Sequence, residues 1–246
     1  MKRVKLIIAY DGTNYCGWQI QINGITVEEV LNKAISELTG VETAVIGASR
    51  TDSGVHAMGN VAVFDTETRI PAEKISFALN QRLPNDIRIQ KSDEVPLDWH
   101  PRYRDSTKTY EYKILNRKFD MPTQRLYTHF VYMPLNVEKM KEAAKYIVGE
   151  HDFASFCSSG SQVESTVRTV YRLEVDKNDD VISIIISGNG FLYNMVRIIV
   201  GTLIKVGLGV YPPEYVKEII EAKDRNAAGP KAPACGLMLV KIDYED

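Results

Sequence analysis

Residues 4–40 decide the fold class that we expect, and they read VKLIIAYDGTNYCGWQIQINGITVEEVLNKAISELTG. Residues 4–10 alternate in polarity and then run apolar before an Asp-Gly pair, which predicts a strand followed by a turn. Thr26 and Glu29 form a capping box at the start of a helix, in which apolar residues recur at helical spacing until Gly40. The chain therefore opens with a strand and an amphipathic helix.

The same kind of pattern continues along the first part of the chain. Short strands are predicted at 44–49 and 58–67, where apolar runs are bounded by turn residues. A helix is predicted from Pro71 to about Leu83, and a further strand at 86–95. The predicted order of this part is β-α-β-β-α-β.

The second part of the chain repeats this order roughly, with one additional helix. The predicted strands are 108–116, 168–178, 180–188 and 236–244, and the predicted helices are 136–149, 191–207 and 212–224. No repeat is visible in the sequence itself, so the similarity rests on element order. We expect an α+β fold of two RRM-like or ferredoxin-like split βαβ halves, forming a mainly antiparallel sheet with helices on one face and a central cleft.

Prolines and charged residues interrupt the pattern in WHPRYRDSTK, residues 99–108. We therefore expect an N-terminal half at 1–104 and a C-terminal half at 105–246. The first carries a candidate catalytic aspartate, and the second carries candidate substrate-binding tyrosine and arginine side chains.

Composition excludes several classes of protein. The net charge of the 246 residues is −2, which argues against coating nucleic acid through bulk charge but permits a local basic groove. No apolar run reaches the ~18 residues of a membrane span, and the run after the basic start is too short for a signal peptide. We expect a cytoplasmic protein that does not bind membranes.

Neither a disulfide framework nor a metal site is expected. The cysteines are odd in number and far apart, at Cys16, Cys157 and Cys235. The four histidines show no ligand spacing, and no glycine-rich phosphate loop is present. We expect no metal and no cofactor.

The motif SRTDSGVHA, residues 49–57, carries the first candidate, Asp52. One interpretation is an ordinary turn, because Asp, Ser and Gly are common turn residues. The other is a carboxylate held for chemistry. In extended chain Arg50 shares a face with Asp52, and a guanidinium there favours the ionised form, which can act as nucleophile or general base.

The segment around Tyr110 combines aromatic and basic residues. Residues 100–118 contain six Lys or Arg and two Asp or Glu, interleaved with Tyr103, Tyr110 and Tyr112. This pattern is typical of a solvated strand edge with cross-strand aromatic pairs, or of a surface on which RNA bases stack and cations hold phosphates. Tyr110 and Tyr112 are expected on one face of their strand.

Arg197 interrupts an otherwise apolar predicted helix, FLYNMVRIIVGTLIKVG. It fits a plain surface stripe through Asn194 and Gly201, as in an ordinary amphipathic helix. Alternatively, it points into a cleft and pairs with a carboxylate or a phosphate, since arginine is rarely buried without a partner.

Five segments in order resemble the tRNA pseudouridine synthase A family. They are YDGTNYCGWQIQ (10–21), SRTDSGVHA (49–57), KTYEY (108–112), GNGFLYNMVRIIVGTL (188–203) and KAPACGLMLVKIDY (231–244). Together they span nearly the whole chain, which makes the resemblance far more specific than any single motif. Ser49, Ser53 and Cys16 depart from the usual family residues, and none of these changes removes a functional group.

The resemblance implies that uridine is isomerised to pseudouridine at positions 38, 39 and 40 in the anticodon stem-loop of tRNA, without a cofactor. It implies that Asp52 is the essential carboxylate and that the uridine is flipped out of its stack. It leaves open whether Asp52 attacks the sugar C1′, attacks the base or removes a sugar proton. It also implies a homodimer in which one tRNA touches both subunits.

The remaining site residues follow from the same resemblance. Tyr110 corresponds to the tyrosine that packs on the target base, and Arg50 to a residue that helps to place the flipped nucleotide. Arg197 corresponds to the arginine that pairs with the catalytic carboxylate. Leu237 corresponds to an apolar contact in the pocket, although a core position in the last strand explains it equally well.

Two other functions compete with this one. A noncatalytic RNA-binding module with RRM-like halves fits the element order, but the glycine and clustered aromatics of an RNP1 motif are absent. A carboxylate-dependent hydrolase would need paired carboxylates or metal ligands near Asp52, and none is evident in the sequence.

Overall fold

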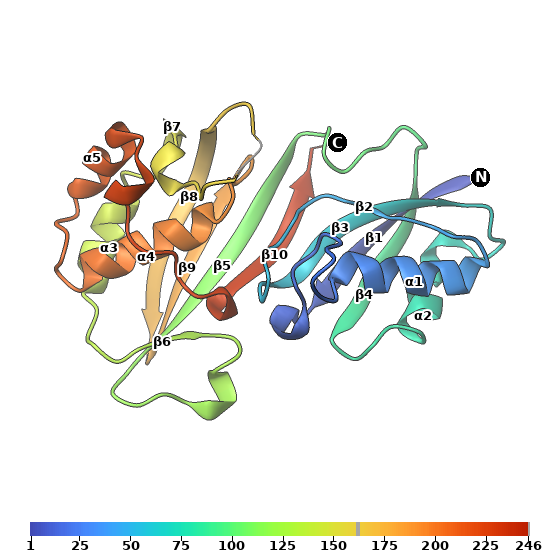
Figure 1. Cartoon of the computed structure of the whole chain (residues 1–246), viewed down its shortest axis with the longest axis horizontal. Helices are drawn as coiled ribbons and strands as arrows, with labels where there is room; N and C mark the ends of the chain where they lie inside the picture. The colour runs from blue at the N-terminus through green and yellow to red at the C-terminus, as the bar shows by residue number, and fades with distance from the viewer. Residues whose placement is uncertain (161–162, 246) are drawn as a thin grey trace. The chain divides into compact units, whose positions relative to one another are not determined.

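The computed structural model describes residues 1–160 and 163–245 (Figure 1). Its contacts divide the chain into two units. Unit 1 comprises Met1–Ser106 and Met238–Asp246, and unit 2 comprises Thr107–Leu237. The expected division into halves at 1–104 and 105–246 remains a prediction about domains, and the two units are described one at a time.

Unit 1 is built on a sheet in which the order is β4-β1-β3-β10, with β2 paired to β3. The strands are β1 (Lys2–Tyr10), β2 (Ile46–Gly47), β3 (His56–Thr66), β4 (Ile87–Val95) and β10 (Leu237–Tyr244). β1 runs antiparallel to both β3 and β4. β10 pairs with β3 in parallel, with Met238 opposite His56.

Two helices of unit 1, α1 (Val27–Thr39) and α2 (Ala72–Asn80), contact each other and cover one face of these strands (Figure 1). The Thr26 side chain accepts the Glu29 N–H, and Gly40 ends α1 in the left-handed conformation at φ 73°. Both predicted helix signals are therefore confirmed. Alternate residues of β1 are fully buried, as the polarity pattern predicts.

Unit 2 is built on the order β5-β9-β8-β7, with β6 paired to β5. The strands are β5 (Ser106–Asn116), β6 (His129–Val131), β7 (Gly149–Asp152), β8 (Val167–Asn178) and β9 (Val181–Gly188). The pairs β5–β9, β9–β8 and β8–β7 are antiparallel, and β6 is parallel to β5. The helices are α3 (Val137–Ala144), α4 (Met195–Gly207) and α5 (Tyr215–Ala222), of which α3 packs on α4 and β8.

Short 3₁₀ turns complete both units. They are η1 (Gly12–Asn14), η2 (Pro122–Gln124), η3 (Ala154–Phe156), η4 (Arg225–Ala227) and η5 (Ala234–Gly236). None of the helices in the described ranges combines the length and hydropathy of a membrane span.

The predicted α+β class with mainly antiparallel strands is confirmed, and so is the order β1-α1-β2-β3-α2-β4. The helix predicted at 191–207 begins only at Met195, because Asn194 has a φ of 61°, which a right-handed helix does not accommodate. The helix predicted at 136–149 ends at Ala144. The short strands β6 and β7 were not predicted, because neither shows the alternation of a longer strand.

Candidate active site

Asp52 lies in the loop between β2 and β3, in a tight turn. The Val55 N–H donates to the Asp52 carbonyl at 3.1 Å, and Gly54 between them has a φ of 76°. A positive φ at the third position is what a type II turn requires, and glycine adopts it without steric cost. The turn interpretation is therefore right for the backbone, and it is compatible with a half-buried carboxylate held at one place for chemistry.

The segment between β1 and α1 packs against this turn through its backbone. The Trp18 N–H donates to the Thr51 carbonyl at 3.0 Å, and the Gly54 N–H donates to the Tyr15 carbonyl at 3.3 Å. A Cβ atom on Gly12 would lie 2.0 Å from the Val55 carbonyl oxygen, so only glycine permits this approach. The motifs 10–21 and 49–57 thus form one structural unit.

A buried polar network holds the start of the same loop. The Tyr10 and Thr51 hydroxyls are 2.7 Å apart, and the Asn60 amide donates to the Ser49 carbonyl at 3.0 Å and to the Tyr10 hydroxyl at 3.3 Å. Asn60 is fully buried in β3. A fully buried amide needs such partners. The sequence analysis missed Asn60, although an amide inside the apolar run of β3 is a usable signal.

His56 connects the far end of the turn to the β1–α1 segment. Its Nδ1 lies 3.1 Å from the Gly12 N–H and 3.1 Å from an Asp11 carboxylate oxygen, and the ring is almost fully buried. The Asp52 loop is therefore fixed at both ends. Arg50, by contrast, is exposed beside it, on the solvent side of the loop.

Tyr110 lies on β5 in unit 2 and is 7% exposed. Its ring meets Phe191 edge to face, at 5.3 Å between ring centres. Tyr112 is fully buried, and its hydroxyl donates to the Pro233 carbonyl at 2.8 Å, so it is a core residue. Burial raises the pKa of the Tyr112 hydroxyl well above its usual value. Of the three interleaved tyrosines, only Tyr103 is exposed, and it belongs to unit 1.

Arg197 lies in the first turn of α4 and is 9% exposed, so the surface-stripe interpretation is wrong. Its Nε donates to the Ala232 carbonyl at 2.7 Å, and its Nη1 donates to the Asn194 side-chain oxygen at 3.1 Å. Asn194 in turn donates to the Ser158 hydroxyl at 3.0 Å. The sequence analysis named Asn194 only as part of a stripe and missed this positioning contact.

Leu237 is the first residue of β10 and is almost fully buried. Two residues earlier, the Cys235 thiol donates to the Thr128 carbonyl at 3.4 Å. The burial of Leu237 agrees with the core interpretation, and its contact with a substrate base stays a prediction.

The structure places the five predicted site residues in two sets. Arg50 and Asp52 lie together in unit 1, and Tyr110, Arg197 and Leu237 lie in unit 2. Hydrogen bonds hold the backbone around Asp52 in the first set and the side chain of Arg197 in the second, whereas Arg50 is exposed.

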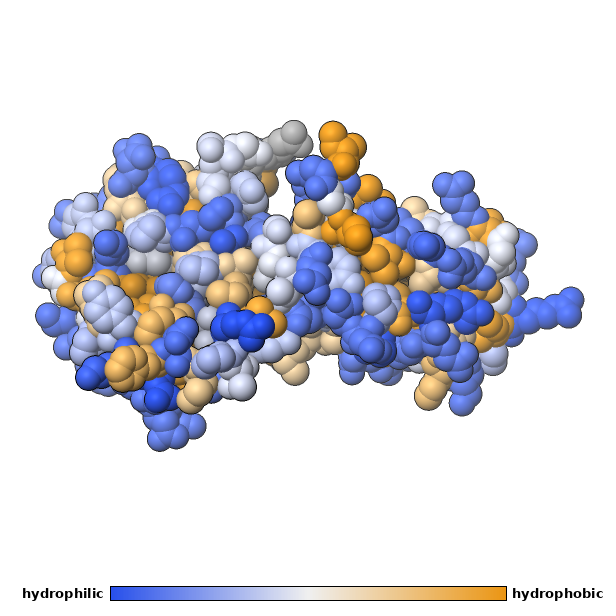
Figure 2. All heavy atoms as spheres, turned by 60° about the horizontal axis from the view of Figure 1, so that its bottom comes forward, coloured by the Kyte–Doolittle hydropathy of each residue, from blue (hydrophilic) through white to orange (hydrophobic). Residues whose placement is uncertain are grey.

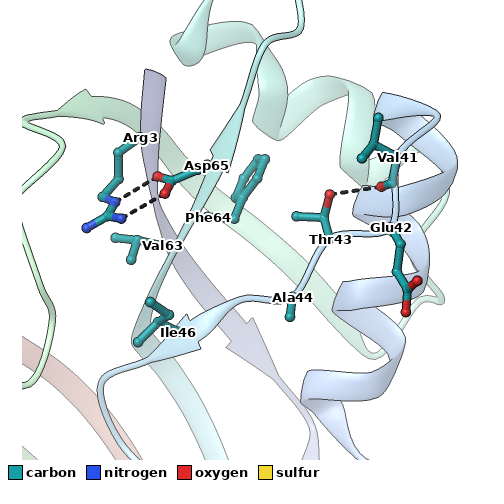
Figure 3. Close-up of a pocket in the computed structure, with 9 residues that line it drawn as sticks. All are labelled: Arg3, Val41, Glu42, Thr43, Ala44, Ile46, Val63, Phe64 and Asp65. Carbon is teal, nitrogen blue, oxygen red and sulfur yellow. Dashed lines mark hydrogen bonds and ion pairs between the residues drawn. The ribbon is translucent and has the colours of Figure 1, made fainter. Parts of the chain in front are cut away.

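A separate pocket in unit 1, of about 260 Å³, holds none of these residues (Figure 3). Arg3 and Asp65 form a two-pronged ion pair at its edge, with both N–O distances 2.8 Å. The hydrogen bond from Arg3 lowers the pKa of the Asp65 carboxyl. Arg3, Asp65 and Thr43 in the lining of this pocket all have hydrogen-bond partners. The described residues include no cluster of side chains suited to a metal ion.

The chain belongs to the tRNA pseudouridine synthase family, whose model matches residues 6–104 and 143–245. It is 55% identical to tRNA pseudouridine synthase A of Thermoanaerobacter sp. (strain X514), over 99% of this chain and 100% of that protein. It is 50% identical to tRNA pseudouridine synthase A of Clostridium acetobutylicum over the same shares. The expected family is thereby confirmed.

Among solved structures, the chain resembles one titled as the archaeal box H/ACA sRNP Nop10–Cbf5 complex. The likeness covers 92% of this chain and 60% of that chain, at 11% identity and a TM-score of 0.38. The family assignment rests on the family model and the sequence relatives.

Membership of the family makes the protein an isomerase that converts uridine to pseudouridine in tRNA. The two competing functions, a noncatalytic RNA-binding module and a hydrolase, are therefore set aside.

Proposed function

We propose that the protein isomerises uridines at positions 38, 39 and 40 in the anticodon stem-loop of tRNA, with Asp52 as the essential carboxylate. The observation that carries this proposal is the fixing of the Asp52 loop at both ends within the motif SRTDSGVHA. In the reaction the bond from the base nitrogen to C1′ breaks, and a bond from C5 of the same base to C1′ forms. The C5 proton leaves and the nitrogen gains one, so atoms and electrons balance.

A uridine in a stacked stem-loop is not accessible to a carboxylate, so we propose that the enzyme flips it out. Tyr110 then packs on the flipped base. Its ring is braced by Phe191 and carried by a long paired strand, so it keeps its orientation without further ordering cost. Leu237 supplies an apolar contact to the same base.

Two arginines complete the proposed machinery. Arg197 pairs with the Asp52 carboxylate and keeps it ionised, and its own orientation is set by the Ala232 carbonyl and Asn194. Arg50 is exposed beside Asp52, where it helps to place the flipped nucleotide. Whether Asp52 bonds to C1′, attacks the base or takes a sugar proton is a separate choice, and each route needs an ionised carboxylate.

We further propose that the enzyme works as a cytoplasmic homodimer that contacts one tRNA with both copies. The family resemblance of the five motifs supports this, as it supports the division into functional halves at 1–104 and 105–246. Sedimentation of the protein with and without tRNA measures the number of copies in the complex.

The decisive experiment uses tRNA labelled with tritium at uridine C5, because pseudouridine formation releases that label to water. We expect release by the wild type and none above background by Asp52→Ala or Asp52→Asn, with tRNA binding retained by both. The Asn variant keeps the shape of the side chain, removes its charge and replaces one acceptor oxygen with an NH2 donor. Normal release by either variant would sink the assignment of Asp52.

The positional claim has its own test. Three tRNA substrates, each with a single labelled uridine at position 38, 39 or 40, are compared with one labelled only outside the anticodon stem-loop. Release from the first three and none from the fourth is expected. Release from the fourth at a similar rate contradicts the proposed positions while leaving Asp52 untouched.

A further inference from the structure

The connection between β5 and α3 is long for a compact fold, and long connections of this kind usually have a function. Its base is firmly held. The Asn116 amide donates to the carbonyls of Val131 and Met133 at 2.9 and 2.8 Å, and the Asn116 side-chain oxygen accepts the Leu135 N–H at 3.2 Å. β6 adds a short parallel pairing with β5. Residues 117–133, which we call the aromatic loop, therefore extend from a rigid base within unit 2.

The aromatic loop exposes large rings beside positive charges. Phe119 is 67% exposed and Tyr132 is 65% exposed. The Lys118 ammonium lies over the Phe119 ring, 5.3 Å from its centre. The loop contains three Lys or Arg and one Asp or Glu.

The loop lies below β6 in Figure 1 and comes forward at the lower left of Figure 2, where hydrophobic and strongly hydrophilic side chains are mixed. The surface of the loop thus combines hydrophobic and charged side chains, unlike a purely apolar surface. An interface core between proteins is depleted in charge, whereas a surface for single-stranded RNA combines stacking rings with cations.

The aromatic loop is also continuous with a proposed site residue. The Thr128 carbonyl accepts the Cys235 thiol, and Cys235 precedes Leu237 by two residues. One end of the aromatic loop therefore contacts the segment that carries Leu237.

We propose that the aromatic loop binds the tRNA strand beside the target uridine, with Phe119 stacking on an unpaired base and Lys118 holding an adjacent phosphate. The inference rests on the proposed function, because that function assigns Leu237 to the target base. Stacking on an exposed ring tolerates any base, so this contact serves neighbouring target positions without reading sequence.

The test measures tRNA affinity without turnover, by filter binding at several salt concentrations. Stacking contributes ~1–3 kcal/mol per base, so we expect Phe119→Ala to weaken binding roughly 5- to 150-fold. Phe119→Trp keeps a stacking ring and should bind like the wild type. Lys118→Ala should reduce the slope of log affinity against log salt by about 0.7–1, the share of one phosphate contact.

α2 offers a matched control. Phe77 is 66% exposed, and the Lys74 ammonium lies 5.4 Å from its ring centre. Unit 1 therefore contains a lysine and an exposed ring arranged like Lys118 and Phe119 of unit 2. Phe77→Ala should bind tRNA like the wild type. An equal loss in Phe77→Ala and Phe119→Ala would overturn the proposal, because it would show a general effect of exposed rings.

Two further outcomes would overturn it. One is unchanged tRNA affinity in a folded Phe119→Ala protein, with folding checked by thermal unfolding. The other is a loss of self-association in Phe119→Ala during sedimentation without tRNA, which would assign the loop to an interface between copies. Failure of the proposed function shows instead as tritium release by Asp52→Ala, a separate measurement that requires no change in the loop.

Discussion

Asp52 is positioned by residues from three segments of unit 1. Gly54 makes the turn, Trp18 and Tyr15 hold its backbone, and the Tyr10–Thr51–Asn60 network fixes its start. A carboxylate in the proposed catalytic role needs this kind of support, since small displacements cost large factors in rate.

Tyr10→Phe tests the network at its centre. The change leaves Thr51 and Asn60 without the hydroxyl that they share, and a buried polar group that loses its partner costs about 1–3 kcal/mol. We expect the free energy of unfolding to fall by that amount in urea titrations. We also expect slower tritium release at saturating tRNA.

Tyr244→Phe is the matched control for this change. It likewise removes one hydrogen-bonded tyrosine hydroxyl, which here donates to the Pro101 carbonyl at 3.0 Å, far along the chain from the Asp52 loop. We expect the free energy of unfolding of this variant to fall, while its rate of tritium release stays that of the wild type. Equal rate losses in both variants would show that Tyr10 acts only through general stability.

Asn194 holds a left-handed conformation and orients Arg197 through one hydrogen bond. Asn194→Ala forces a side chain into this conformation at a cost of ~1–2 kcal/mol, whereas Asn194→Gly removes that strain. Both lose the contact to Arg197. We therefore expect Asn194→Gly to unfold at a higher temperature than Asn194→Ala, while both release tritium more slowly than the wild type.

Asn194→Asp keeps an oxygen for Arg197 and should recover most of the rate. If Asn194→Gly, Asn194→Ala and Asn194→Asp all release tritium at the same rate, Asn194 affects stability alone.

At the scale of elements, the β1–α1 segment and the Asp52 turn touch through their backbones. The approach of Gly12 to Val55 leaves no room for a methyl group. Such contacts transmit a shift in one segment directly to the other, because packed interiors have little free volume.

Gly12→Ala should therefore displace the turn. Its new Cβ would lie 2.0 Å from the Val55 carbonyl oxygen, and overpacking of this kind costs ~1–3 kcal/mol. We expect a lower unfolding temperature and a lower rate of tritium release.

Gly190→Ala is the comparison, because the nearest atom outside its own neighbours lies 3.7 Å from the added Cβ. A Gly12→Ala protein as stable as Gly190→Ala would contradict the close packing described here.

The sequence predicts elements well where a local signal exists. The capping box at Thr26 and the alternation of β1 place α1 and β1 correctly, because both signals come from neighbouring residues. The start of α4 was wrong by four residues, since an apolar run does not reveal the φ of Asn194. β6 depends on a partner strand, and its three residues carry no pattern of their own.

At the scale of each unit, ion pairs join distant segments. The hydrogen bond from Arg3 lowers the pKa of Asp65, and hydrogen bonds from Thr166 and then Lys223 lower the pKa of Asp152. Both carboxylates therefore bind protons more weakly in the folded protein than in the unfolded chain. Their stabilisation is complete above about pH 4, the usual carboxyl range, and is lost as the pH falls through the lower folded values.

We accordingly expect the urea midpoint to drop between pH 7 and pH 3. Asp65→Asn and Asp152→Asn should lower the midpoint at pH 7 and flatten this dependence. Partly exposed pairs of this kind contribute about 0.2–1 kcal/mol each, because solvent screens them. A pH dependence that both variants leave unchanged would assign acid sensitivity to other carboxylates.

Only some residues of the candidate site are predictable from the sequence. Asp52, Tyr110 and Arg197 were named because their motifs resemble a family, whereas Asn60 and Tyr10 act through contacts between segments 40 to 50 residues apart. Long-range hydrogen bonds leave no local pattern. The parallel pairing of β10 with β3 is hidden for the same reason, since β10 lies at the other end of the sequence.

That pairing has a consequence for biosynthesis. β3 begins at His56, where the Asp52 loop ends, and its partner there is β10, roughly 180 residues later in the chain. At ~5–20 residues per second, a ribosome takes roughly 9 to 36 seconds to make the intervening chain. During that interval the nascent first unit keeps an open strand edge beside its aspartate loop, and such edges recruit other chains. Synthesis of β10 closes this edge, so a nascent chain that is released before β10 is made is exposed to aggregation there.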